Sequence, residues 1–151
     1  MPKAIIFIGL QASGKSTYYH QILQNDYVHI TLDSLHTRNK ERLLMEECFT
    51  AGRSFVVDNT NPTAADRERY ISAARQYGYE VEGYFFQSVI AACVERNHLR
   101  SGKACVPDKA IAATSNRMEL PSYQEGFDKL YFVRIAQGMF ITEEWNDKDG
   151  K

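Results

Sequence analysis

The chain has 151 residues, of which 44% are hydrophobic, so we expect one domain over residues 1–151 with a single hydrophobic core. Its 18 basic and 19 acidic residues give a formal net charge of -1, which argues against a protein that coats a polyanion. The 3 cysteines form no Cys-x-x-Cys pair and the 4 histidines lack metal-ligand spacing, so neither a disulfide framework nor a bound zinc ion is expected.

The amino terminus contains a short apolar segment, Ala4–Ile8. Gly9 ends this segment after a handful of residues, and no cleavage-site pattern follows it. The segment is also too short to cross a membrane. We therefore expect no membrane association and a cytoplasmic location.

A phosphate-binding loop (P-loop, or Walker A motif) follows that segment and precedes a helical stretch at about residues 15–25. Its glycines let backbone N–H groups surround phosphate oxygens, Lys15 can reach the β and γ phosphates, and the Ser16 hydroxyl can ligate Mg²⁺. The helix N-terminus adds a favourable dipole. The loop predicts a bound nucleoside triphosphate, with ATP the expected donor. The candidate nucleotide-binding residues are Gly9, Ala12, Ser13, Gly14, Lys15, Ser16 and Thr17.

Apolar strand candidates alternate with helical segments along the rest of the chain. This alternation predicts a three-layer α/β fold, with a mainly parallel five-stranded sheet and helices on both faces. A short polar tail is expected at about residues 143–151. The strand candidates are residues 4–8, 27–31, 54–57, 80–86 and 130–135, and the helix candidates are residues 15–25, 34–51, 63–77, 89–99 and a segment that follows Pro107 and extends past Arg117.

Two aspartates follow strand candidates, at the carboxyl edge of the predicted sheet. Asp33 comes directly after the second strand candidate, where its carboxylate can accept a proton from an attacking hydroxyl group. Asp58 ends the third candidate and can face Mg²⁺ or its water ligands, as a Walker B acid does. Each aspartate also fits a helix cap or a turn. Thr60 and Asn61 offer further hydrogen bonds to a phosphate or sugar.

Basic residues gather in two segments. Arg96 and Arg100 share one face of a predicted helix, from which both can reach the phosphates and neutralise charge during transfer. They begin a basic lid over residues 96–117, which includes Lys103, although basic residues at a helix end also complement the helix dipole. Arg38 begins a second cluster that can contact an acceptor phosphate or form a solvated helix face.

Together these segments resemble the 5′-kinase domain of polynucleotide kinases from phage and from animal repair proteins. The resemblance covers nearly the whole chain. A phosphate-binding loop alone is unspecific, whereas this ordered set of segments discriminates better between families. The matching segments are Gly9–Thr17, Asp33, Val57–Pro62, Arg67 with Tyr70, Arg96 with Asn97 and Arg100, and Gly102–Pro107.

The resemblance implies a magnesium-dependent kinase that transfers the γ-phosphate of ATP to the 5′-hydroxyl end of DNA or RNA in nucleic-acid repair. It implies that Lys15 and Ser16 hold the donor phosphates and magnesium, and that Asp33 is the general base. The lid contacts to the nucleotide would come from Arg96 and Arg100. The acceptor side would be organised by Asp58, which also faces magnesium through water, and by Thr60 and Asn61.

One position departs from the resemblance. Some members of that family have an arginine three residues after the catalytic aspartate, where it contacts the acceptor phosphate, and this chain has His36 there. Arg38 can take this role, or the acceptor preference differs. The phosphatase domain that accompanies many relatives is not found in this sequence, so no 3′ end-healing activity is expected.

Two other functions fit the same residues. Many compact P-loop kinases that act on small molecules, such as a sugar acid or a nucleoside, share this size and order of elements. A non-catalytic nucleotide-binding switch is the second alternative, and the presence of Asp33 together with the arginine pair argues against it. RNA or DNA preference and oligomeric state are left open by the sequence.

Overall fold

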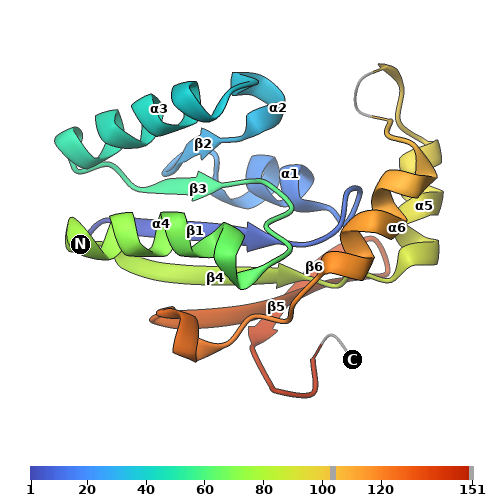
Figure 1. The fold of residues 1–151 in the computed structure, drawn as a ribbon. Coiled ribbons are helices and arrows are strands. Elements are labelled where there is room, and N and C mark those ends of the chain that lie inside the picture. Colours follow the sequence, from blue (N-terminus) through green and yellow to red (C-terminus); the bar gives the residue numbers. More distant parts are fainter. Residues whose placement is uncertain (103–104, 150–151) are drawn as a thin grey trace.

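The computed structural model describes residues 1–102 and 105–149. Within these residues, six strands form one sheet at the centre of the molecule (Figure 1). Each strand is rich in apolar or β-branched residues, which pack well on a pleated surface. The strands are β1 (Lys3–Ile8), β2 (Val28–Ile30), β3 (Phe55–Val57), β4 (Glu80–Phe86), β5 (Lys129–Ala136) and β6 (Met139–Glu144).

The order of the strands in the sheet is β2-β3-β1-β4-β5-β6. Strands β1 to β5 run parallel, and β6 pairs antiparallel with β5 at one edge. Parallel pairing places the carboxyl ends of β1, β2 and β3 side by side, which is where α/β proteins bind ligands. The predicted α/β class with a mainly parallel sheet is confirmed, whereas the predicted number of five strands is wrong for the described residues because β6 was missed.

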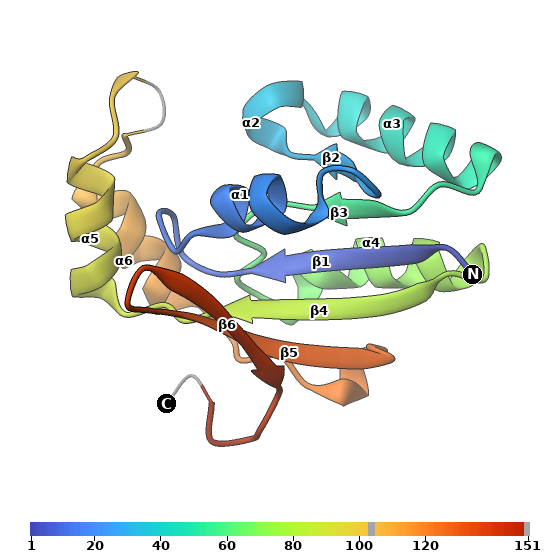
Figure 2. The same cartoon turned by 180° about the vertical axis from the view of Figure 1, so that it is seen from behind.

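Helices cover both faces of the sheet, as the two opposite views show (Figures 1 and 2). None of the helices in residues 1–102 and 105–149 is long and apolar enough to span a membrane. The helices are α1 (Lys15–Tyr18), its π-helical continuation η1 (Tyr19–Leu23), α2 (Leu32–Leu35), α3 (Arg38–Ala51), α4 (Ala64–Gln76), α5 (Ile90–His98), α6 (Asp108–Arg117) and the short 3-10 helix η3 (Tyr123–Glu125).

The alternation of side chains along β1 builds the two faces of the core. Ile6 faces one side and packs in a cluster with Met45 of α3 and Tyr70 of α4. Phe7 faces the other side and packs with Tyr18 of α1. Successive strand residues point to opposite faces, so a strand such as β1, in which residues 4–8 are all apolar and buried, must be covered on both. The phosphate-binding loop therefore leaves the sheet from a strand that is buried on both faces.

The helix predicted over residues 34–51 is interrupted in the structure. His36 adopts a left-handed conformation with φ of 68° and ends α2. A residue in that conformation cannot continue a right-handed helix. The Thr37 side chain then caps α3 by accepting a hydrogen bond from the Lys40 N–H at 3.1 Å. As a result, α2 is a separate four-residue helix directly after β2.

The carboxyl-terminal hairpin was not predicted. Gln137 and Gly138 have φ of 53° and 74°, which suits the tight two-residue turn between β5 and β6. Phe140 of β6 packs edge-on against Tyr18 of α1, with ring centroids 5.2 Å apart. The tail predicted from residue 143 is thus wrong at its start, because β6 extends to Glu144. Residues 150 and 151 of that tail lie outside the described residues.

Candidate active site

The phosphate-binding loop, Gly9–Thr17, leaves no space for a side chain at two of its glycines. A Cβ atom on Gly9 would lie 2.8 Å from Ser13 Oγ, and one on Gly14 would lie 3.0 Å from Phe140 Cε1. Gly14 also has φ of 102°, in the left-handed region that favours glycine. The tight turn that these glycines permit directs backbone N–H groups toward an anion. The predicted loop is therefore compatible with a bound phosphate chain.

Lys15 lies folded back against this loop and is only 8% exposed. Its ammonium group donates hydrogen bonds to the carbonyl oxygens of Gly9 at 3.1 Å and Leu10 at 2.8 Å. Burial lowers the pKa of Lys15, and the nearby charge of Asp58 partly opposes this shift. Anionic phosphate oxygens are stronger acceptors than carbonyl oxygens, so the ammonium group can exchange its partners for a nucleotide phosphate.

Ser16 and Asp58 meet directly beneath the loop. The Ser16 hydroxyl donates to Asp58 Oδ2 at 2.7 Å, and His29 Nε2 of β2 lies 2.7 Å from the same oxygen. Burial alone would raise the pKa of Asp58, but the hydrogen bond from His29 and the charge of Lys15 outweigh it and hold that pKa below its usual value. Asp58 is therefore an ionised carboxylate next to the P-loop hydroxyl.

A hydroxyl oxygen and a carboxylate oxygen are the hard ligands that Mg²⁺ prefers, so Ser16 and Asp58 fit the magnesium ion that the sequence predicts. His29 was missed by the sequence analysis because it shows no metal-ligand spacing. In the structure its ring stacks on Tyr19, with centroids 4.0 Å apart and an interplanar angle of 12°. His29 is thus fixed between an aromatic ring and the Asp58 carboxylate.

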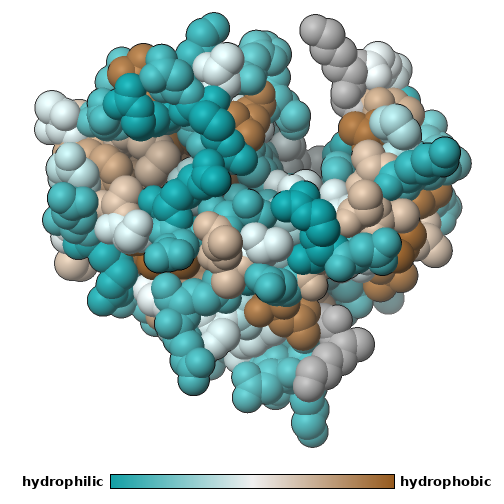
Figure 3. All heavy atoms as spheres, viewed as in Figure 1, coloured by the Kyte–Doolittle hydropathy of each residue, from teal (hydrophilic) through white to brown (hydrophobic). Residues whose placement is uncertain are grey.

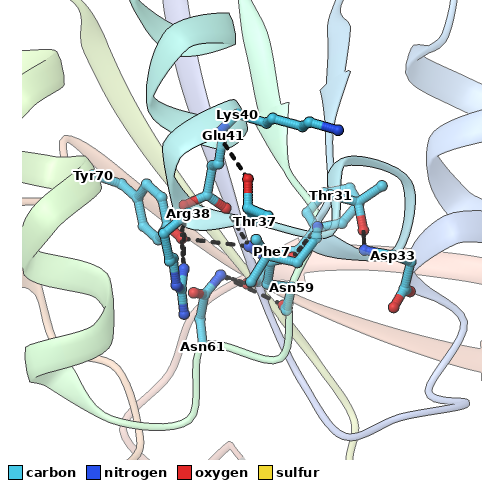
Figure 4. Close-up of polar contacts among 11 residues, drawn as sticks. Phe7, Thr31, Asp33, Thr37, Arg38, Lys40, Glu41, Asn59, Asn61 and Tyr70 are labelled. Carbon is cyan, nitrogen blue, oxygen red and sulfur yellow. Dashed lines mark hydrogen bonds and ion pairs between the residues drawn. The ribbon is translucent and has the colours of Figure 1, made fainter.

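Asp33 lies in the first turn of α2, at the carboxyl edge of the sheet. The helix cap is Thr31, whose hydroxyl accepts from the Asp33 N–H at 3.3 Å, so the alternative interpretation of Asp33 as the cap is wrong. The Asp33 side chain is exposed, and its negative charge acts on the Lys15 ammonium. Figure 4 shows its carboxylate pointing away from the cluster of polar side chains behind it. The carboxylate is accessible to an incoming hydroxyl group.

The two lid arginines approach the loop from α5. Arg96 Nη1 donates to the carbonyl oxygen of Ala12 at 3.3 Å. Arg100 is exposed, just beyond the end of α5, and its charge contributes to lowering the pKa of Lys15. Both arginines therefore interact with the P-loop, Arg96 through a hydrogen bond and Arg100 through its charge. Lys103, which was also assigned to the lid, lies outside the described residues together with residue 104.

Two contacts anchor the lid helices. Gln11 Nε2 of the P-loop donates to Thr114 Oγ1 of α6 at 3.0 Å. Asn97 of α5 makes two hydrogen bonds to the backbone of Val106, one through Nδ2 at 2.6 Å and one through Oδ1 at 2.9 Å. Asn97 therefore ties together the two ends of the segment between α5 and α6. The sequence analysis recognised Asn97 only as part of a matching segment.

The segment after β3 does not present all of its polar residues to the site. Asn61 is buried, and its Nδ2 donates to the carbonyl oxygen of Phe7 at 2.8 Å, so it braces the end of β1. Thr60 accepts from the Gly9 N–H through its carbonyl oxygen at 3.1 Å. Asn59 instead accepts from the Leu32 N–H of α2 at 3.0 Å. The sequence analysis included Asn59 only as part of the matching segment Val57–Pro62 and gave it no role.

Arg38 begins α3, two residues beyond His36. Its Nη1 donates to Tyr70 Oη at 2.7 Å and to Glu41 Oε1 at 3.1 Å, while 52% of the side chain remains exposed (Figure 4). His36 is exposed at the end of α2. Of the two candidates for an acceptor-phosphate contact, Arg38 is the one held by a buried network.

The site faces a hollow in the surface. Figure 3 shows this hollow between the side of the molecule that carries α2 and α3 and the side that carries α5 and α6. The P-loop lies between the two sides, with Arg96 on the lid side and Asp33 on the opposite side. Lys15, Ser16 and Asp58 are thus brought together at the base, whereas the side chains of Asn61 and Arg38 engage neighbouring elements.

This arrangement defines a P-loop kinase: a phosphate-binding loop after the central strand, an ionised carboxylate beside its hydroxyl, and a separate acidic residue facing the opening. Residues 38–121 match the family described as AAA domain, and the chain belongs to this family of P-loop kinase domains. The match begins after the P-loop, so the family assignment does not depend on that motif alone.

Two relatives extend along most of the chain. One from Acanthamoeba polyphaga mimivirus is 33% identical over 150 residues, and one from Schizosaccharomyces pombe is 26% identical over 146 residues. Both are named bifunctional polynucleotide phosphatase/kinase, the viral one provisionally. The matches cover 93% and 94% of this chain but 36% of each relative, so the chain spans about a third of their length.

Solved structures support the fold. A gluconokinase from Sinorhizobium meliloti has a TM-score of 0.64 and 22% identity, over 90% of this chain and 84% of that one. Kti12 from Chaetomium thermophilum, solved in complex with ADP-AlF3, has a TM-score of 0.63 and 17% identity, over 97% of this chain and 91% of that one. At such low identity, the likeness concerns the α/β fold and not the substrate.

Proposed function

We propose that this P-loop kinase transfers the γ-phosphate of ATP to the 5′-hydroxyl end of DNA or RNA. The observation that carries the proposal is the accessible Asp33 carboxylate, which acts electrostatically on Lys15 across the mouth of the P-loop. The names of the two relatives favour a polynucleotide as the acceptor. The role of such an enzyme would lie in nucleic-acid end repair.

In the proposed reaction, Asp33 accepts the proton of the 5′-hydroxyl group as its oxygen attacks the γ-phosphorus. The bond from that phosphorus to the β,γ-bridging oxygen breaks, ADP leaves, and the proton passes from Asp33 to solvent. Lys15, Arg96 and Arg100 neutralise the negative charge of the transferring group. Magnesium, held by Ser16 and through water by Asp58, would supply further neutralisation of the phosphates.

A groove of about 370 Å³ between α3 and α4 offers a path for the acceptor strand beyond its first nucleotide. Arg38 lines the groove at the start of α3, and Arg69 lines it from α4. Phe49 and Tyr77 also line it, with their rings stacked 4.3 Å apart. Arginines for phosphates and aromatic rings for bases are the groups that bind single strands without sequence preference.

The test is transfer of label from γ-labelled ATP, with magnesium, to matched DNA and RNA oligonucleotides that carry either a 5′-hydroxyl or a 5′-phosphate end. We expect label only on the hydroxyl ends. Asp33→Ala should lower transfer by about 10²-fold or more, because a general base contributes about that much. Asp26→Ala, which removes an exposed aspartate in the turn before β2, is the matched control and should leave transfer unchanged.

Two outcomes would replace the proposal. Transfer to gluconate or to a nucleoside, with none to oligonucleotides, would make the protein a small-molecule kinase. ATP binding without transfer to any acceptor would make it a nucleotide-binding switch. Full activity of the Asp33→Ala variant would leave the transfer reaction in place but remove the proposed base.

A further inference from the structure

Glu41 is a buried carboxylate on α3 that the proposed reaction does not use. It is 3% exposed, and a buried carboxylate is costly unless donors satisfy both of its oxygens. Oε1 accepts from Tyr70 Oη at 2.9 Å and from Arg38 Nη1 at 3.1 Å, while Oε2 accepts from Asn59 Nδ2 at 3.0 Å. Figure 4 shows these three side chains converging on Glu41 from α3, α4 and the end of β3.

One branch of this cluster leads to the backbone beside Asp33. The contact with Glu41 requires the donor nitrogen of Asn59 to face the carboxylate, which turns Asn59 Oδ1 the other way. That oxygen accepts from the Leu32 N–H at 3.0 Å, and Leu32 is the first residue of α2. A rotated amide would place two donors opposite each other at Leu32. The carboxylate therefore selects the orientation of Asn59 that holds α2.

Such an anchor matters because α2 has only four residues. A helix of that length is far below the length at which an isolated helix forms, so external contacts must hold it. The Thr31 hydroxyl caps it at one N–H, and Asn59 satisfies the N–H of Leu32. The position of the Asp33 backbone thus depends on Asn59.

The second branch leads to the guanidinium of Arg38. Burial and the charge of Glu41 raise the pKa of Tyr70 to about 12, so its hydroxyl group stays protonated at neutral pH. That hydroxyl group donates a hydrogen bond to Glu41. Tyr70 Oη then accepts from Arg38 Nη1 at 2.7 Å and, over a longer distance of 3.4 Å, from Asn59 Nδ2 of the first branch. Both bonds of Arg38 use this one nitrogen, and 52% of its side chain stays exposed beside the groove.

We propose that Glu41 is a positioning residue that orients Asp33 through Asn59 and Arg38 through Tyr70. This inference rests on the proposed function, in which Asp33 takes the acceptor proton and Arg38 meets an acceptor phosphate. It predicts that a change in the Asn59 branch alters kcat, whereas a change in the Tyr70 branch alters the KM of the acceptor. If the cluster only braced α3 against α4, changes in either branch would lower stability without affecting kcat and KM differently.

The experiment compares three single variants with a matched control in steady-state transfer assays. Asn59→Ala should lower kcat about tenfold and leave the KM of the acceptor nearly unchanged, because it removes the anchor of α2. Tyr70→Phe should raise the acceptor KM several-fold and leave kcat nearly unchanged, because it releases Arg38. Glu41→Gln should lower kcat and raise the acceptor KM. The side-chain amide has one accepting oxygen and one donating NH₂ group, whereas all three partners of Glu41 are donors.

Glu47→Gln is the control, because it makes the same change on the same helix at an exposed residue that does not line the groove. It should leave both constants unchanged. Arg38→Lys is a conservative test of the second branch. In the Tyr70→Phe background it should add little to the acceptor KM. The proposal is overturned if Asn59→Ala and Tyr70→Phe each lose kcat and acceptor affinity to the same extent. It is also overturned if Glu41→Gln has the same kcat and acceptor KM as wild type.

Amide hydrogen exchange of Leu32 separates a failure of this inference from a failure of the proposed function, because it needs no acceptor. Exchange at Leu32 should be about tenfold faster in Asn59→Ala and Glu41→Gln than in wild type and Glu47→Gln. If no oligonucleotide is labelled, the proposed function fails, and faster exchange at Leu32 still supports positioning of α2. Unchanged exchange in both variants overturns it whatever the acceptor is.

Discussion

The two sides of the site are built in different ways. On the donor side, Lys15 contacts Gly9 and Leu10, which lie only six and five residues away in the chain. On the acceptor side, α2 is held by Asn59, which lies 27 residues beyond Leu32, and Arg38 is held by Tyr70, 32 residues away. The donor side is therefore centred on one continuous loop, to which Asp58 and Arg96 are added from other elements, whereas four separate elements form the acceptor side.

This difference teaches that the two sides can be perturbed separately. Asp58 and Ser16 are joined to the P-loop, and their contacts do not pass through Glu41 or Tyr70. Changes on the donor side should alter the use of ATP and magnesium. Changes on the acceptor side should alter the acceptor KM or the delivery of Asp33, with ATP binding preserved.

The largest effect is expected from Lys15→Ala on the donor side. It should lower transfer by about 10³-fold, because it removes the cation nearest the transferring phosphate from a buried site. Stability should change less than transfer does, because burial disfavours the charge of Lys15 while its hydrogen bonds to Gly9 and Leu10 favour the folded state. Transfer assays and thermal unfolding test both expectations, with Lys148→Ala as the exposed control. Substantial transfer by the variant would contradict the donor-side assignment.

A smaller effect is expected from Asp58→Asn. The neutral amide keeps the shape of the side chain but weakens magnesium binding, so the apparent KM for Mg²⁺ should rise by about 10–100-fold. The acceptor KM at saturating magnesium should change little, which is the signature of a donor-side residue. Titration of transfer against magnesium measures this, with Asp26→Asn as the control. A selective rise in the acceptor KM would instead assign Asp58 to the acceptor side of the site.

The same difference explains how far the sequence could predict the molecule. The donor side was predictable because an apolar strand, a glycine loop and a helix follow one another in the chain. Strand positions were equally accessible, since β1 contains a continuous apolar run that is buried on both faces and β4 ends in an aromatic run. The Ser16 and Asp58 contact also matches the expected pairing of a P-loop hydroxyl with an acid after a neighbouring strand.

The acceptor side was less accessible, because its contacts are tertiary. His36 adopts a left-handed conformation, and the sequence around it gives no indication of this. The break between α2 and α3 was therefore missed. Glu41 reads as one more charged residue on a polar helix, and only the fold places it opposite Asn59 and Tyr70. β6 alternates too weakly to be distinguished from a polar tail.

An intermediate effect is expected from Arg38→Ala, which removes the exposed cation on the acceptor side. The acceptor KM should rise about tenfold, and the KM for ATP should stay the same, because Arg38 contacts no residue of the P-loop among its described partners. Arg53→Ala is the matched control, since Arg53 is an exposed arginine just beyond the end of α3 and does not line the groove. Kinetics with oligonucleotides of one and several nucleotides measure the change. An equal rise in the KM for ATP would mean that Arg38 affects ATP binding as much as acceptor binding, and that the two sides are not independent.

The smallest effect concerns the stability of the acceptor-side cluster at high pH. The pKa of Tyr70 rises from 10.0 in the unfolded chain to about 12 in the folded protein. Below pH 10 both states keep the proton, and between pH 10 and 12 only the unfolded state loses it, so stability falls as the pH rises through this window. From pH 9 to pH 11, this group should lower the free energy of unfolding by about 1 kcal/mol.

Tyr70→Phe removes this contribution, so its free energy of unfolding should fall less between pH 9 and pH 11 than that of wild type. Urea denaturation at the two pH values measures the difference, and Tyr123→Phe, at an exposed tyrosine, should behave as wild type does. Other tyrosines whose pKa the fold raises, such as the partly buried Tyr84, are present in both proteins, so their contributions cancel in the comparison. An equal decline in wild type and Tyr70→Phe would mean that Glu41 does not hold the Tyr70 proton, and the branch from Glu41 to Arg38 would lose its central link.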